Sequence, residues 1–191
     1  MNRAYDIDEV LFDSHGHLDP QGPLATDRPS VLKLFGSYTA PFGTTIGFFQ
    51  YAGSGTPITT YLETANGTEV FVNGRGDMGR TPFLSQTDML IQHDMKMSGK
   101  TLRFELNVLN LFNQKTARHI FNSYNRGAGT AVASSAVALA PINLTKGYDY
   151  KALVAATPDA SKAIGAIDPR FGKQDLWNTG TVSYVTAKFL F

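Results

Sequence analysis

The chain has 191 residues, and its 17 Lys and Arg against 16 Asp and Glu leave a net charge of +1. This balance argues against nucleic-acid binding, which needs a clustered basic surface, so we expect no nucleic-acid partner. The absence of cysteine excludes disulfides and thiolate metal sites. Charged residues at 17%, aromatic residues at 12% and 18 glycines favour β structure with many turns over disorder.

The N-terminal segment 1–19 has no apolar core after Arg3, so it is not expected to be a signal peptide, and the chain contains no run of about 18 apolar residues that could form a membrane-spanning helix. The segment HGHLD at 15–19, with Asp13 and Asp19 nearby, offers two imidazoles and two carboxylates, which are suitable ligands for zinc or another transition metal. The spacing is not that of a zinc-binding helix, and Gly16 and Pro20 indicate a loop. We therefore interpret the segment as a polar loop and predict no metal or cofactor. A metal-dependent hydrolase is kept as a third hypothesis.

Five segments have the alternating or β-rich pattern of long strands, namely 31–40, 44–53, 85–97, 101–112 and 181–191. The pattern is clearest in 101–112, where apolar and polar residues occupy alternate positions from Leu102 to Val108. In 85–97, His93 falls on the otherwise apolar side, and an interface position is one explanation for it.

The connections between these segments alternate in length. Residues 40–43 and 98–100 form short turns that contain glycine, as antiparallel hairpins need. Residues 54–84 and 113–179 form long links, and the second contains two segments with helical spacing, 149–156 and 159–167. Outer-membrane barrels have short periplasmic turns and long extracellular loops in this alternation.

The predicted fold class is all-β: an antiparallel meander of about five long strands, forming a partial transmembrane β-barrel with long extracellular loops, one of which has short helices. A basic side chain that faces lipid at mid-bilayer costs about 2–4 kcal/mol. We therefore predict that Lys33, Arg103, Glu105 and Lys188 face the lumen, while Phe189 and Phe191 belong to the lipid face.

Five ordered segments, TDRPSVLKLFGSYTAPFGTTIG, GSGTP, GRGDMGRTPFLSQTDMLIQHD, LRFELNVLNLFNQ and DPRFGKQDLW, precede the final strand. Together they resemble the C-terminal barrel region of TonB-dependent outer-membrane receptors, in particular the Oar-like branch, over roughly residues 22–191. The resemblance implies a non-enzymatic role in energised substrate uptake across the bacterial outer membrane. It also implies that Phe191 and Phe189 form the signal that the outer-membrane assembly machinery recognises.

Such receptors have barrels of about 22 strands, an N-terminal plug and a short box that binds the energy-transducing TonB partner. Because this sequence shows none of these, residues 1–191 are expected to be a C-terminal fragment, and contact with TonB would need the missing N-terminal part. The outer edges of strands 31–40 and 181–191 would lack partners, which lipid cannot supply. The chain alone is therefore predicted not to form a stable inserted barrel.

The alternative is a soluble β-sandwich-like binding or adhesion module that uses the long connections for its ligand. The RGD tripeptide at 75–77 is expected to have a structural role in its loop rather than an adhesive one. The chain has no Ser-His-Asp order and no nucleotide-binding glycine loop, so we predict no enzymatic activity.

Overall fold

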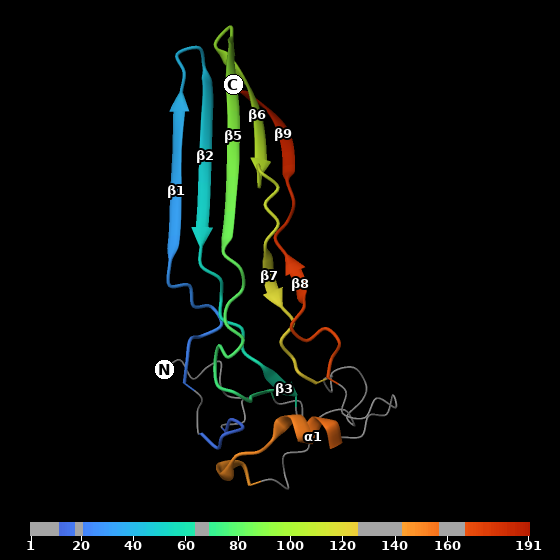
Figure 1. The fold of residues 1–191 in the computed structure, drawn as a ribbon. Helices are drawn as coiled ribbons and strands as arrows, with labels where there is room; N and C mark the ends of the chain where they lie inside the picture. Colours follow the sequence, from blue (N-terminus) through green and yellow to red (C-terminus); the bar gives the residue numbers. More distant parts are fainter. Residues whose placement is uncertain (1–11, 18–20, 64–68, 126–142, 157–166) are drawn as a thin grey trace. The chain divides into compact units, whose positions relative to one another are not determined.

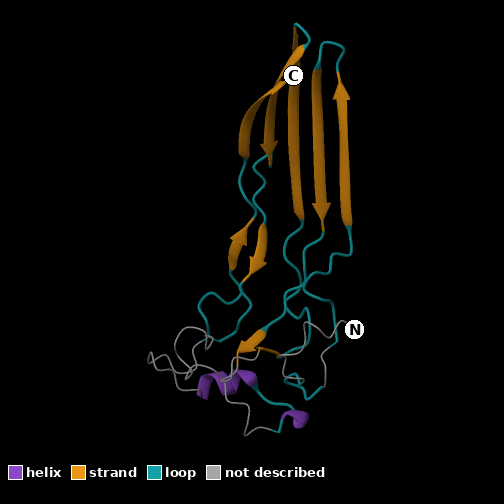
Figure 2. Ribbon diagram, turned by 180° about the vertical axis from the view of Figure 1, so that it is seen from behind, coloured by secondary structure: helices purple, strands orange, loops and turns teal. Residues whose placement is uncertain are grey.

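A computed structural model of the chain describes residues 12–17, 21–63, 69–125, 143–156 and 167–191 (Figure 1). Strands predominate among these residues (Figure 2). The chain divides into two compact units. We call Met1–Asp27, Thr56–Thr81 and His119–Asp175 the core unit, and Arg28–Gly55, Pro82–Arg118 and Leu176–Phe191 the sheet unit.

The sheet unit contains a five-stranded antiparallel sheet with the strand order β1-β2-β5-β6-β9. Its strands are β1 (Val31–Thr39), β2 (Thr44–Gly53), β5 (Leu84–Met97), β6 (Lys100–Leu109) and β9 (Val182–Leu190). The predicted all-β class and the antiparallel meander of five long strands are therefore confirmed. Among the described residues, β1 pairs only with β2 and β9 only with β6, so this sheet is not closed.

Two tight turns connect neighbouring long strands, as predicted. The turn between β1 and β2 is closed by a hydrogen bond from Ala40 N to Thr44 O of 2.7 Å, and Gly43 adopts a φ of 87°. The turn between β5 and β6 consists of Ser98 and Gly99, with φ of 46° and 80°. Two consecutive left-handed residues produce a turn whose twist matches that of the flanking strands.

The predicted strand over 101–112 is too long, because β6 ends at Leu109. Asn110 is 1% exposed and has a left-handed φ of 51°, which turns the chain out of the sheet. Its side chain donates to Gln114 O (3.1 Å) and Thr179 O (2.8 Å) and accepts from Gln114 N (2.8 Å). The local hydrogen bonds of one asparagine therefore override the alternating pattern that continues to Phe112.

The core unit contains short elements that the sequence pattern does not predict. β3 (Tyr61–Glu63) pairs with β4 (Glu69–Phe71), and a 3-10 turn (Leu144–Lys146) precedes the helix α1 (Tyr150–Ala156). α1 confirms the helix expected over 149–156, whereas nearly all of 159–167 lies outside the described residues. The buried hydrophobic cluster of this unit consists of Leu62, Val70, Val72, Tyr124 and Val154.

Two further short strands, β7 (Ala117–Ile120) and β8 (Gln174–Trp177), form a two-stranded sheet. They also lie within a stretch that the sequence pattern treats as a long loop. The long connections thus contain regular structure. Strands of three or four residues are too short for a period of two to be visible in the sequence.

Candidate functional site: a sheet with a charged and an apolar face

The register of the five strands divides their side chains between two faces, because directly paired residues point to the same side of a sheet. Seven charged residues share one side, which we call the charged face: Lys33, Asp88, Asp94, Lys96, Arg103, Glu105 and Lys188. Only one charged residue of these strands, Lys100, lies on the opposite side. The structure thus brings all four predicted lumen-facing residues to one face, and their orientation toward a lumen stays a prediction.

The charged face pairs its charges across neighbouring strands. Arg103 on β6 donates from Nε and Nη2 to the two carboxylate oxygens of Asp94 on β5, at 2.7 and 2.8 Å. Lys188 on β9 donates to both oxygens of Glu105 on β6, at 2.8 and 2.7 Å. Lys33 stands apart from this network on the edge strand β1. The pairs neutralise one another, which allows a strip of charge to lie on one side of the sheet.

The apolar face presents large hydrophobic side chains that no part of the described chain covers. Leu34 is 53% exposed, Phe48 46% and Val185 75%. The face is made up of Leu32, Leu34, Tyr38, Ile46, Phe48, Met89, Ile91, Met95, Met97, Leu102, Phe104, Leu106, Val108, Val185, Ala187 and Phe189. Within the described sheet unit, the buried hydrophobic residues are Ala40 and Ala117, and neither belongs to the five strands.

The polar residues on the apolar face are paired with one another. His93 Nδ1 lies 2.8 Å from Thr44 Oγ1, its direct neighbour in the register. Farther along the same face, Gln50 Nε2 donates to Ser85 Oγ at 3.0 Å and Thr87 donates to Gln50. His93 therefore has a local partner, and its position on this face does not require an interface.

Lys100, the one charged residue on the apolar side, lies at the tight turn beside the last strand. Its Nζ is 5.6 Å from the ring centroid of Phe189 and 5.4 Å from that of Phe191. The two rings meet edge to face at 4.9 Å, and Phe191 is 94% exposed. Aromatic ring faces attract a cation at these distances, which explains how the charged Lys100 is accommodated on the apolar side. The role of both phenylalanines as an assembly signal stays a prediction.

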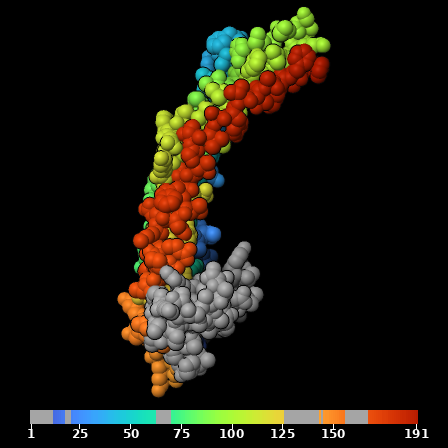
Figure 3. Space-filling view, turned by 90° about the vertical axis from the view of Figure 1, so that its right-hand side faces the viewer, coloured from blue at the N-terminus to red at the C-terminus, as the bar shows by residue number. Residues whose placement is uncertain are grey.

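The outer edge of β9 is uncovered in the described structure. In the space-filling view, the red atoms of β9 lie at the front, with no other described segment over them (Figure 3). In an antiparallel strand with one neighbour, half of the backbone N–H and C=O groups point away from the sheet without a strand partner.

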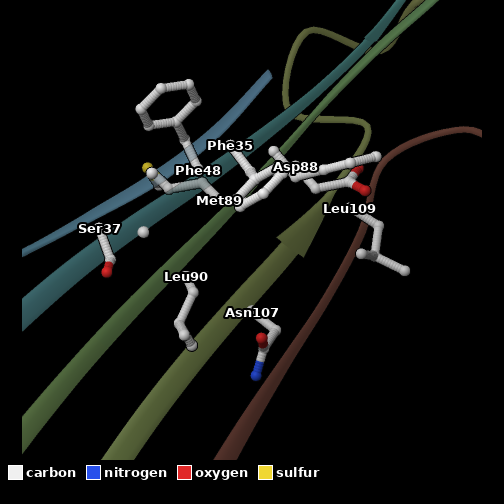
Figure 4. A pocket seen from close by; sticks show the side chains of 11 residues that line it. Phe35, Ser37, Phe48, Asp88, Met89, Leu90, Asn107 and Leu109 are labelled. Atoms are coloured by element: carbon white, nitrogen blue, oxygen red, sulfur yellow. The ribbon is translucent and has the colours of Figure 1, made fainter. Parts of the chain in front are cut away.

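A shallow hollow of about 510 Å³ is lined mainly by residues of the charged face, together with Phe48 and Met89 of the apolar face (Figure 4). Its lining includes Phe35, Ser37, Asp88, Leu90, Asn107 and Leu109. Asp88 already accepts hydrogen bonds from Asn110 N (2.8 Å) and Gln86 Nε2 (2.9 Å). With its one carboxylate engaged and no titratable partner in the lining, the hollow has no arrangement suited to acid–base chemistry.

The RGD tripeptide is held within the core unit. Asp77 accepts hydrogen bonds from Thr60 N (2.7 Å), Thr60 Oγ1 (2.6 Å) and Asn73 Nδ2 (2.9 Å). The Arg75 guanidinium lies 4.5 Å from the centroid of the Phe71 ring. Both charged groups therefore take part in loop structure.

Of the four metal ligands suggested by the sequence, Asp13, His15 and His17 come together in the core unit. Asp19 lies outside the described residues. Their ligand atoms all lie within 4.8 Å of one another.

No protein-family model, curated protein or solved structure matches the chain. None of the helices in the described residues has the length and hydrophobicity needed to cross a membrane.

Proposed function

We propose that the sheet unit is a stretch of wall in a TonB-dependent transporter of the bacterial outer membrane. In this role the apolar face contacts lipid, the charged face lines the lumen, and the chain contributes non-enzymatically to energised substrate uptake. The proposal depends most on one observation: the charged side chains of the five strands share a single face, except for Lys100, while large apolar side chains lie uncovered on the other.

The apolar face needs a cover, because apolar surface in water costs about 25 cal/mol per Å² relative to its buried state. Contiguous apolar patches on soluble monomers rarely exceed about 300–600 Å², whereas this face extends over five strands. A second protein sheet, as in the alternative sandwich module, or a lipid bilayer could provide the cover.

Strand length and charge favour lipid over a second sheet. A transmembrane β-strand tilted at about 45° needs about 9–11 residues, and four of the five strands have 9 or 10, with 14 in β5. The paired charges on the opposite face suit a polar lumen. The ordered sequence resemblance to TonB-dependent receptors also supports a barrel wall.

Among the described residues, the outer edges of β1 and β9 have no strand partner, which favours a wall that continues beyond these five strands. In hydrocarbon, each backbone group without a partner costs several kcal/mol, so spanning sheets close into barrels. The proposed partners are therefore further strands, outer-membrane lipid and the assembly machinery. Contact with the energy-transducing TonB protein is proposed through other parts of the receptor.

Two adjacent substitutions on β6 test the proposal, because neighbouring residues of one strand point to opposite faces. Leu106→Arg places a charge on the apolar face, and Asn107→Arg places the same charge on the charged face. The test measures association of the apolar face with lipid and does not require the chain alone to close into a barrel. We expect Leu106→Arg to lower the fraction of full-length chain that floats with phosphatidylcholine vesicles by about tenfold or more, since an arginine facing lipid costs about 2–4 kcal/mol. Asn107→Arg should leave flotation nearly unchanged.

A folded, monomeric full-length chain that stays in the aqueous fraction, with equal behaviour of both variants, would contradict the membrane role. Such a result would favour the soluble binding or adhesion module.

A further inference from the structure

We propose that Asp13, His15 and His17 form a binding site for one divalent transition-metal ion of the zinc class. The site belongs to the core unit and does not depend on the proposed transport function. It also revises the polar-loop interpretation of HGHLD, because the structure places Asp13, one of the two carboxylates that the sequence offers, beside both histidines.

The ligand atoms lie near the separations that one small ion needs, all within 4.8 Å of one another. His17 Nδ1 lies 3.2 Å and His15 Nδ1 lies 3.9 Å from the same carboxylate oxygen, Asp13 Oδ2. Ligands bound tetrahedrally at 2.0–2.2 Å, the usual zinc distances, are roughly 3.3–3.6 Å apart. The rings of His15 and His17 are stacked with centroids 6.0 Å apart and planes at 19°. Small side-chain rotations would therefore place all three ligands around one ion.

The Asp13 carboxylate is already oriented for this task. Its Oδ1 accepts hydrogen bonds from the backbone N–H groups of His15 and His17, both at 2.9 Å. These bonds leave Oδ2 directed at the two imidazoles. Metal ligands are commonly fixed in this way by hydrogen bonds from neighbouring groups.

The charge of Asp13 suits a cation. The carboxylate side chain is 6% exposed, while the His15 and His17 side chains are 63% and 75% exposed. The proposed ion would thus be held by the buried Asp13 carboxylate on one side and remain accessible to solvent on the side of the two imidazoles.

The backbone under the cluster is pinned to the core unit. Ser14 N donates to the carbonyl of the buried Val72 at 2.9 Å, and Tyr148 N donates to Ser14 O at 2.8 Å. Gly16 has a φ of 80°, and a Cβ there would lie 2.6 Å from Thr145 O. Because these backbone contacts fix the loop, the three ligands need little reorganisation when a metal binds, which favours metal affinity.

The ligand set indicates the class of metal. Two imidazoles and one carboxylate suit zinc, copper, nickel or iron more than calcium or magnesium, which prefer oxygen ligands. Three protein ligands leave at least one coordination position for water or an added ligand. We therefore expect a reversible, exchangeable site rather than a closed structural one.

Titration of the full-length chain in detergent with zinc, followed by calorimetry, tests the site directly. The chain has four histidines, so the double variant His93→Gln/His119→Gln is a matched control that leaves only His15 and His17. We expect one equivalent of zinc to bind to the wild type and the control with affinities equal within about twofold. His15→Ala and His17→Ala should each weaken binding by about tenfold or more, in line with the loss of a ligand.

Both alanine variants alter exposed side chains, so circular dichroism should show an unchanged fold. Asp13→Asn should weaken binding similarly, although its buried position makes it the less decisive variant. The proposal is overturned if the wild type binds no zinc at millimolar concentration, or if affinity falls in the His93/His119 control and persists in the His15 and His17 variants.

Discussion

The core unit and the sheet unit bury their hydrophobic residues to very different degrees. In the core unit, Leu62, Val70 and Val72 are 0% exposed and pack with one another. In the sheet unit, Leu34 and Val185 are more than half exposed, although they belong to longer and more regular strands. Regular secondary structure and a buried core are therefore separate properties in this chain. The core unit carries its own apolar interior, whereas the apolar side chains of the sheet unit lie largely exposed among the described residues.

The largest expected effect comes from one matched pair of leucine substitutions that contrasts the two units. Leu62→Ala removes a fully buried side chain from the core unit and should cost about 2–5 kcal/mol. Leu34→Ala truncates an exposed side chain on the apolar face and should change stability by less than about 0.5 kcal/mol in water.

Hydrogen–deuterium exchange, read separately for peptides from 69–81 and 31–53, measures both effects, since local opening energies differ between units. Equal losses of protection in the two variants would show that the apolar face is packed against protein.

A second substitution tests what ends β6 in the sheet unit. Asn110→Ala deprives Gln114 N and Thr179 O of their hydrogen-bond partner and forces alanine into a left-handed conformation. We expect a loss of about 2–3 kcal/mol, because buried polar groups without partners cost about 1–3 kcal/mol. Urea unfolding followed by the fluorescence of Trp177, the single tryptophan, provides the measurement.

Asn110→Gly is the matched control for the cost of the left-handed backbone conformation. Glycine tolerates the left-handed φ but loses the same hydrogen bonds, so it should be less destabilising than alanine by about 1 kcal/mol. If glycine and alanine were equally destabilising, the left-handed conformation would contribute nothing to the ending of β6.

A smaller effect is expected from Tyr148 in the core unit. Burial raises the pKa of its hydroxyl to about 12, and the negative charge of Asp13 adds to this shift. Because the folded chain holds this proton more tightly than the unfolded chain, whose tyrosines titrate near 10, the contribution to stability is complete below about pH 10. It is lost as the pH rises toward 12.

Thermal unfolding at pH 9 and pH 11 should therefore show a larger fall in midpoint for the wild type than for Tyr148→Phe. An equal fall in both proteins would remove Tyr148 as the cause of the alkaline sensitivity.

The long strands could be predicted from the sequence because each has enough residues for a period of two to emerge. The end of β6 could not, since LNLF continues the alternating pattern while the buried side chain of Asn110 redirects the backbone. β3 and β4 have three residues each, and β7 and β8 have four. The pairing of β7 with β8 joins segments distant in the chain, which local pattern does not contain, whereas β3 and β4 lie close together in the chain and are too short for a period of two to emerge.

The candidate sites were predictable to different extents. The alternation of Arg103 and Glu105 with apolar neighbours predicts that both share a face, but their partners Asp94 and Lys188 follow only from strand register. HGHLD identifies two metal-ligating residue types, whereas the choice of Asp13 depends on backbone hydrogen bonds that fold the loop back on itself.

The two faces of the sheet are proposed to contact different media, and labelling of successive positions along β6 distinguishes those media. Because the chain lacks cysteine, single cysteines at 104, 105, 106, 107 and 108 can each carry an environment-sensitive fluorophore without background labelling. The full-length chain in lipid bicelles would then be exposed to a quencher attached to the lipid acyl chains. We expect strong quenching at 104, 106 and 108, on the apolar face, and weak quenching at 105 and 107, on the charged face. Uniform quenching along the strand, or protection of all five positions, would show that the two faces do not contact different media.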